Sequence, residues 1–205
     1  MKKTLEEAII KADEVDVARS EEYALLASLL LRAPDAETLT RLSSLEGTAT
    51  PLGAAHAALA QSAAFASAEA VDREYFDLFL GVGRGELVPY ASYYLTGFLN
   101  ERPLARLRQD MKRLGLERAE GHGDPEDHIG TLCEIMSGLA AGAFEASVDD
   151  QAKFFARHVA PWAGPFFADL ESASAASFYR AVGEVGRIFI EIEAEGFAME
   201  SRRSA

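Results

Sequence analysis

The spacing of apolar residues is the feature that most constrains the fold of this chain. Along almost its whole length they recur three and four positions apart rather than two, and runs of β-branched residues are missing. This pattern is typical of amphipathic helices, whereas half-buried strands alternate with period two. Alanine-rich stretches such as residues 51–70 also favour helix by intrinsic propensity. The sequence therefore predicts an all-α fold, a single globular domain of roughly ten helices.

Capping residues predict where several helices begin and end. Ser20 is expected to cap a helix that starts at the next residue. Pro103 suits the first turn of a helix that Gly115 would end. Ser147 and Asp150, three residues apart, resemble a capping box with Asp in place of the usual Glu.

The last segment, residues 174–199, predicts one long amphipathic helix. Its expected apolar face consists of Phe178, Val182, Val185, Phe189 and Ile192.

No repeat or low-complexity linker divides the chain into separate domains. The glycine-containing stretch near residue 120 is the candidate boundary between an N-terminal helical group, 1–118, and a C-terminal helical group, 125–205. Residues 119–124 could therefore act as a hinge. The alternative is an ordinary loop between helices.

Composition narrows the possible partners. The chain has 205 residues, 33 acidic against 20 basic, and a net charge of −13. Such a negative field opposes binding to nucleic acid and to anionic lipid and favours basic partners, although acidity can also serve solubility alone. No apolar run is long enough for a membrane helix, and the N-terminal stretch does not resemble a signal peptide, so we expect a cytoplasmic protein without stable membrane insertion.

Common catalytic and cofactor motifs are missing from the sequence. The glycine-rich segment 81–87 has Glu86 where a dinucleotide loop needs glycine, and no phosphate loop or H-E-x-x-H pair occurs. Cys133 is the single cysteine, so no internal disulfide or cysteine-based zinc site can form. We expect no catalytic residues, no metal and no cofactor bound by the protein itself.

A group of ionisable residues follows the candidate hinge. Asp124 is expected to cap a helix, with Glu126 and Asp127 in its first turn, where carboxylates meet the positive end of the helix dipole. Helical geometry places Cys133 in the apolar face, His128 at the edge of that face and Asp127 nearly opposite the face. A helix start and an active site are the two interpretations of this stretch.

Aromatic residues are unusually dense between residues 75 and 95, around the glycine-rich turn. They could belong to the core, or their apolar rings and polar hydroxyls could form a peptide-binding groove. The residues concerned are Tyr75, Phe76, Phe79, Tyr90, Tyr93 and Tyr94.

Together these two stretches resemble the redox-enzyme maturation chaperones, the family of the trimethylamine oxide reductase and dimethyl sulfoxide reductase chaperones. The family's E-P-x-D-H motif corresponds to residues 124–128, with Asp124 in place of Glu, and its H-x-x-P-W segment corresponds to residues 158–162. The resemblance extends from about residue 20 to the C-terminal helix. The family's aromatic-x-x-L-F, glycine turn and L-x-P-[YW]-x-S-x-Y pattern is matched by Tyr75, Leu78, Phe79, Gly83, Gly85, Leu87, Pro89, Tyr90, Ser92 and Tyr94.

The resemblance implies an all-helical, non-catalytic chaperone. Its ligand would be the twin-arginine signal peptide of the apo form of a molybdenum or tungsten oxidoreductase, held until the client's molybdopterin guanine dinucleotide cofactor is inserted. A basic leader with an apolar segment needs carboxylates beside an apolar groove. The residues carried over as signal-peptide-binding are Tyr75, Leu78, Phe79, Pro89, Tyr90, Ser92, Tyr94, Asp124, Glu126, Asp127 and His128.

Several alternatives stay open within and beyond this interpretation. The client could be an exported enzyme, with segment 81–108 most similar to the formate dehydrogenase branch, or a cytoplasmic enzyme of the nitrate reductase type. The chaperone could be a monomer or a domain-swapped dimer. A small nucleotide hydrolase that uses Asp127 and His128, or a purely structural helical subunit, are the alternatives from other classes.

Overall fold

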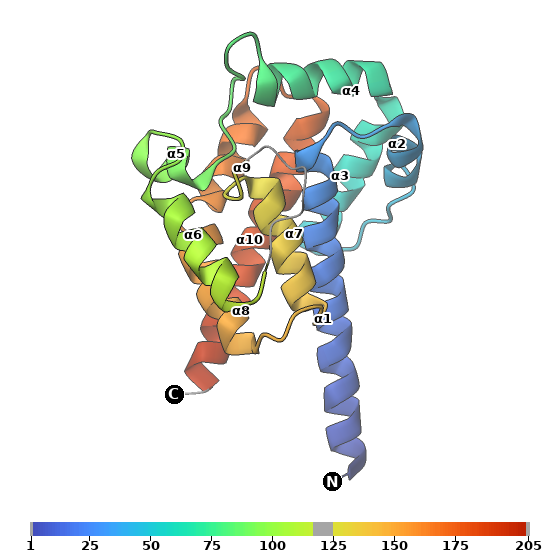
Figure 1. Ribbon diagram of the computed structural model, residues 1–205. Coiled ribbons are helices and arrows are strands. Elements are labelled where there is room, and N and C mark those ends of the chain that lie inside the picture. Colours follow the sequence, from blue (N-terminus) through green and yellow to red (C-terminus); the bar gives the residue numbers. More distant parts are fainter. Residues whose placement is uncertain (1, 117–124, 204–205) are drawn as a thin grey trace.

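The computed structural model describes residues 2–116 and 125–203 (Figure 1). These residues form ten α-helices and two π-helical segments, with one isolated β-bridge and no strands, which confirms the predicted all-α fold. The elements are α1 Lys2–Leu31, α2 Ala36–Leu42, α3 Pro51–Phe65, α4 Ala68–Tyr75, η1 Phe76–Leu80, α5 Ala91–Thr96, α6 Arg102–Arg113, α7 Ile129–Ala140, α8 Val148–Phe154, η2 Phe155–Val159, α9 Ala163–Ser172 and α10 Phe178–Arg203.

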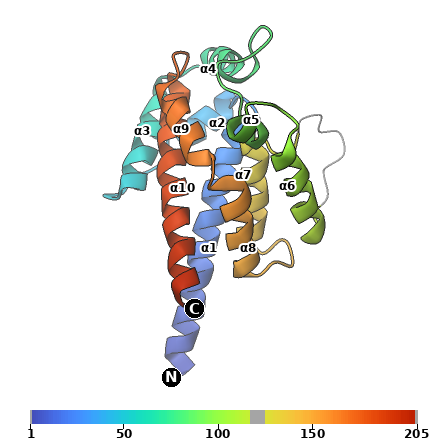
Figure 2. The ribbon, with the colours of Figure 1, turned by 90° about the vertical axis from the view of Figure 1, so that its left-hand side faces the viewer.

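The two long helices, α1 and α10, organise the bundle (Figures 1 and 2). Helix α7 packs along α1, while α9 and α3 pack against α10. Buried side chains from both predicted helical groups, such as Tyr23, Met136 and Phe167, belong to one hydrophobic cluster. The two groups thus share a core, and the candidate hinge at 119–124 lies outside the described residues.

Three of the four predictions from capping residues are confirmed and one is wrong. Pro103 lies in the first turn of α6. The capping box of Ser147 and Asp150 begins α8, and Gly115, with a φ of 69°, follows the end of α6. Ser20 caps nothing, because α1 is continuous through it. The Ser20 hydroxyl instead lies 3.1 Å from the Ser137 hydroxyl of α7, so its polar group serves a helix–helix contact.

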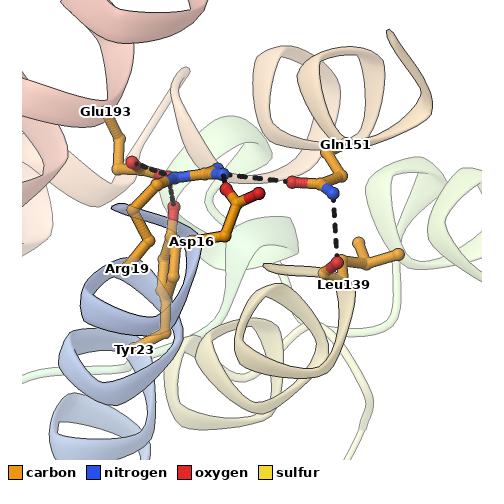
Figure 3. A network of polar contacts seen from close by, with 6 residues as sticks. All are labelled: Asp16, Arg19, Tyr23, Leu139, Gln151 and Glu193. Carbon is orange, nitrogen blue, oxygen red and sulfur yellow. Dashed lines mark hydrogen bonds and ion pairs between the residues drawn. The ribbon is translucent and has the colours of Figure 1, made fainter. Parts of the chain in front are cut away.

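The long C-terminal helix is confirmed, but its buried face differs from the prediction at one position. Ile192 is 46% exposed, whereas its neighbour Glu193 is 4% exposed. Glu193 is buried because it is fully paired: Arg19 donates to its two oxygens at 2.7 and 3.0 Å, and the Tyr23 hydroxyl donates at 2.9 Å. Figure 3 shows Arg19 of α1 between Glu193 of α10 and Gln151 of α8. This ion pair fixes the rotation of α10 and turns Ile192 outward.

Among the described residues, no helix is both long enough and apolar enough to cross a membrane.

Candidate functional site

The two motif stretches are joined by a short antiparallel contact. Tyr90 and His128 form the β-bridge, the Ala91 N–H donates to the Asp127 carbonyl at 2.9 Å, and the Ile129 N–H donates to the Pro89 carbonyl at 2.9 Å. The Tyr90 and His128 rings meet edge to face, 5.0 Å apart. Segments far apart in the sequence are therefore held in one extended pair.

This pairing moves the start of α7, so the predicted helix start is wrong. Residues 127 and 128 do not form a first helical turn; α7 begins at Ile129 with His128 as its N-cap, and the His128 Nδ1 accepts from the Gly130 N–H at 3.1 Å. Backbone hydrogen bonds to the 89–91 segment outweigh the local preference for a cap at Asp124. Asp124 itself lies outside the described residues.

Asp127 is a buried clamp rather than a surface carboxylate. Its side chain is 1% exposed, and Oδ2 accepts from both the Ser92 N–H at 2.8 Å and the Ser92 hydroxyl at 2.5 Å. Its other oxygen, Oδ1, is buried and has no hydrogen-bond partner among the described residues. A buried carboxylate oxygen without a partner is costly, so Oδ1 is a natural acceptor for a donor that comes from outside.

Glu126 differs from the sequence-based expectation in another way. Its carboxylate is 8% exposed and accepts from Arg108 Nε at 2.9 Å and Nη2 at 2.8 Å. Because this carboxylate already pairs with a cation of its own chain, it is not an open partner for an incoming arginine.

The glycine-rich turn folds back on the π-helical segment η1. The Leu87 N–H donates to the Leu78 carbonyl at 2.8 Å, and Glu86 donates likewise to Asp77 at 3.0 Å. A Cβ on Gly85 would lie 2.5 Å from the Leu78 oxygen, so only glycine permits this approach. Leu78 is fully buried beneath the turn.

The motif tyrosines hold neighbouring elements together. The Tyr75 hydroxyl donates to the Leu30 carbonyl at 3.2 Å, at the end of α1, and the Tyr75 ring meets Phe79 edge to face at 5.0 Å. The Tyr94 hydroxyl donates to Asp169 at 2.9 Å, and its ring packs 5.3 Å from Trp162. Burial and this bond to a carboxylate raise the pKa of Tyr94 well above its usual range.

The third motif block lies on and after the second π-helical segment, η2. His158 lies 2.8 Å from Asp110, which also accepts from Arg157 at 2.7 Å, and the Trp162 indole donates to the His158 carbonyl. Burial lowers the pKa of His158 despite its carboxylate partner. Burial alone would raise the pKa of Asp110, but the hydrogen bonds from His158 and Arg157 outweigh it and hold that pKa below its usual value.

All three blocks meet around one small cavity between α5, α6, α7 and η2. Its volume is about 50 Å³, several times what one water molecule needs. Asp127, with its unpaired oxygen, lines it together with His158. The complete lining is Ala91, Leu95, Pro103, Arg106, Leu107, Asp127, Leu132, Arg157 and His158.

Exposed apolar side chains lie on the elements of the first motif stretch. These elements are η1, the glycine-rich turn, α5 and the turn that follows α5. We call these residues the apolar strip. None of them is among the residues carried over from the family's motif, although Phe76 and Leu95 belong to the aromatic stretch that the sequence offered as a possible groove. The strip consists of Phe76, Leu80, Val82, Leu95, Phe98 and Leu99, each between 42% and 98% exposed. Figure 1 shows η1, the turn and α5 at the upper end of the bundle. The predicted residues Leu78, Pro89 and Ser92 are buried beneath these elements and support them.

Sequence reasoning missed two carboxylates that position the motif elements. Glu86 accepts from the backbone N–H groups of Ser174 and Ala175, and Glu74 accepts from those of three residues at the start of α10. Both lie next to motif residues, but nothing in their sequence indicates a target nearly a hundred residues away. In the described parts of the chain, no three His, Cys, Asp or Glu side chains gather as metal ligands would.

A helical bundle that places an apolar strip beside a small cavity with a buried carboxylate in its wall is typical of a protein that binds a peptide segment. The family model described as the nitrate reductase delta subunit matches residues 45–168. The chain therefore belongs to this family, which confirms the resemblance to the redox-enzyme maturation chaperones.

Curated relatives agree with this assignment. A chaperone protein TorD from Vibrio cholerae is 26% identical over 127 residues, covering 58% of each chain. The chain thus spans somewhat over half the length of this relative. A chaperone protein TorD from Shewanella loihica is 26% identical over 203 residues, covering 87% of this chain and 92% of the relative. Both relatives are named as chaperones, which supports the predicted non-catalytic role.

The fold has a solved counterpart in a protein from Archaeoglobus fulgidus described as a redox enzyme maturation protein. The two structures superpose with a TM-score of 0.57 at 21% identity, over 84% of this chain and 93% of the other. At this identity the likeness concerns the fold alone.

Proposed function

We propose that this protein is a chaperone that binds the N-terminal leader of an oxidoreductase precursor and holds the precursor until its molybdenum or tungsten cofactor is inserted. The observation that carries this proposal is the convergence of three motif blocks on one cavity beside the apolar strip. A twin-arginine leader combines a basic head with an apolar segment. Its two parts match a buried carboxylate oxygen and a row of exposed apolar side chains.

In this proposal Asp127 receives one arginine of the leader. Its Oδ1 is buried and lacks a partner, and the cavity that Asp127 lines provides room for the end of a polar side chain. A charge-assisted hydrogen bond in such a site contributes about 1.5–3 kcal/mol. The net charge of −13 speeds the encounter with a basic peptide but adds little to its affinity.

The apolar strip receives the apolar segment of the leader. The buried and half-buried motif residues Leu78, Phe79 and Pro89 hold the strip in place from beneath. The strip, not the motif, would then adapt the site to a client.

A second candidate client is an enzyme retained in the cytoplasm. It is favoured by the description of the matching family, nitrate reductase delta subunit. In that case the cavity would take a polar group of an N-terminal segment without the twin arginines. A formate dehydrogenase is the exported client that segment 81–108 favours.

A nucleotide hydrolase that uses Asp127 and His128 fits the geometry poorly. The two side chains are 1% and 6% exposed, and each accepts a hydrogen bond from a backbone N–H. An acid–base pair needs access to a substrate, and these groups have a structural task instead.

Fluorescence anisotropy with a labelled twin-arginine leader peptide tests the proposal. Replacing both arginines of the peptide by glutamine should weaken binding at least tenfold, since each lost contact is worth about 1.5–3 kcal/mol. The double variant Leu80→Ser/Phe98→Ser should also weaken binding, whereas Phe65→Ser, 86% exposed on α3, should not. Equal binding of the arginine and glutamine peptides would contradict the export-leader proposal and leave the cytoplasmic client as the better candidate.

A further inference from the structure

A second concave surface lies over α10, between α1 and α3. It is a groove of about 580 Å³, far larger than the cavity at Asp127. Phe189 and Glu193 of α10, 3% and 4% exposed, form its floor. The walls come from α1, from α3 and from the segment before α3. The complete lining is Val15, Ala18, Arg19, Glu21, Glu22, Leu25, Leu45, Leu52, His56, Phe189, Ile192 and Glu193.

The groove gathers apolar side chains that the core leaves partly open. Val15 and Ile192 are 54% and 46% exposed at its edge, and Leu25, Leu45 and Leu52 are half-buried along its walls. Scattered exposed apolar residues are ordinary, but a concave row of them is typical of an interaction surface.

The charges of the groove leave one carboxylate uncompensated. Glu193 pairs with Arg19, and both oxygens of Glu22 lie 3.0 Å from His56 Nε2. Glu21 is exposed and makes no ion pair or hydrogen bond with any described residue. A cation brought next to the apolar walls would therefore meet a free negative charge.

We propose that this groove docks an amphipathic helix of a partner protein, with large aliphatic side chains on one face and a lysine or arginine beside them. The lining residues of α1 run from Val15 to Leu25, which is a rise of about 15 Å and matches three turns of a partner helix. Three turns present anchors at i, i+4 and i+7 to the groove, and the basic residue pairs with Glu21.

The groove and the Asp127 cavity lie on different sides of the bundle. Helix α3, which forms one wall of the groove, and α6, which lines the cavity, lie on opposite sides of α10 in Figure 2. Both surfaces can thus be occupied at once. Binding at the groove therefore does not depend on binding of the leader.

The test uses a labelled, designed amphipathic peptide of about four helical turns, with leucines on one face and lysines flanking them. A matched peptide carries glutamate in place of lysine. Anisotropy should show the lysine peptide binding at least tenfold more weakly to Val15→Ser/Ile192→Ser than to wild type. The control Val17→Ser/Met199→Ser removes equally exposed apolar groups from α1 and α10 outside the groove and should change binding less than about twofold.

The charge arm compares Glu21→Gln with Glu14→Gln, an exposed carboxylate on the same helix that does not line the groove. Only Glu21→Gln should weaken the lysine peptide several-fold, and neither should affect the glutamate peptide. Thermal melts confirm that each variant is folded. Equal effects of groove and control variants would overturn the proposal, because they indicate non-specific attraction. Self-association that Val15→Ser/Ile192→Ser abolishes, without peptide binding, would overturn it too and identify a second copy as the occupant.

Discussion

Removing the Ser92 hydroxyl tests the Asp127 clamp most sharply. Ser92 is fully buried, and its hydroxyl donates to the Asp127 Oδ2 at 2.5 Å. A hydrogen bond to a charged group contributes about 1.5–3 kcal/mol, so Ser92→Ala should lower the free energy of unfolding by that amount. In a chain of 205 residues this corresponds to a fall in Tm of about 3–12 °C.

Asp127→Asn provides the second side of a double-mutant cycle. The amide oxygen can still accept from the Ser92 N–H and hydroxyl, but as a neutral acceptor, so we expect a loss of about 1–3 kcal/mol. Because both substitutions weaken the same contact, the double variant should lose about 1–2 kcal/mol less than the sum of the two single variants.

Urea unfolding followed by circular dichroism measures all four proteins. Ser28→Ala, an exposed serine on α1, is the matched control and should stay within about 0.5 kcal/mol of wild type. A fall in the free energy of unfolding below about 0.5 kcal/mol for Ser92→Ala would show that the contact between Ser92 and Asp127 does not stabilise the fold. Strict additivity of the two substitutions would show the same.

Gly85, His56 and Arg106 provide further tests of the structure. Gly85→Ala should lower the free energy of unfolding, measured in urea, by about 1–3 kcal/mol, because the new Cβ would meet the backbone of residues 78 and 79. The control Gly164→Ala has open space around the new Cβ and should be neutral. Equal effects of the two substitutions would contradict the close approach at Gly85. The hydrogen bond to Glu22 raises the pKa of His56 above 6.5, so protonated His56 stabilises the folded state below pH 6.5, and this stabilisation is lost as the pH rises through the folded-state pKa. The difference in free energy of unfolding between wild type and His56→Gln should therefore be larger at acid pH than at pH 8.5. A difference that does not change with pH would contradict this. Arg106 lines the Asp127 cavity and opposes an incoming cation, so Arg106→Gln should tighten leader binding roughly fivefold in anisotropy. Arg102→Gln on the same helix should change the affinity little. Equal changes in affinity for the two variants would indicate that only the net charge of the protein matters.

The helices could be predicted because their signals are local. Periodic apolar residues identified α10, and the Ser147 capping box identified the start of α8. The start of α7 could not be predicted, because the contact between residues 89–91 and 127–129 joins segments that no local rule connects. Glu193 shows the same limit: this carboxylate is buried because Arg19, far away in the sequence, pairs with it.

The sequence could not show which residues of the candidate site are exposed. The motif identified the stretches that meet, yet Leu78 and Ser92 lie beneath the surface and Glu126 is paired with Arg108. Apart from Phe76 and Leu95, the apolar strip was missed, because the same apolar periodicity describes buried and exposed residues in a short element. The π-helical geometry of η1 and η2, both at motif blocks, also has no reliable sequence signal.

The proposed function requires that this protein hold the precursor of an oxidoreductase through its leader. Co-purification of the tagged protein from cells that produce the apo-precursor, with and without its leader, tests that claim most directly. We expect the apo-precursor to be recovered, to be lost when its leader is deleted, and to be reduced by Leu80→Ser/Phe98→Ser. Recovery that is equal with and without the leader, or the absence of any oxidoreductase, would contradict the account.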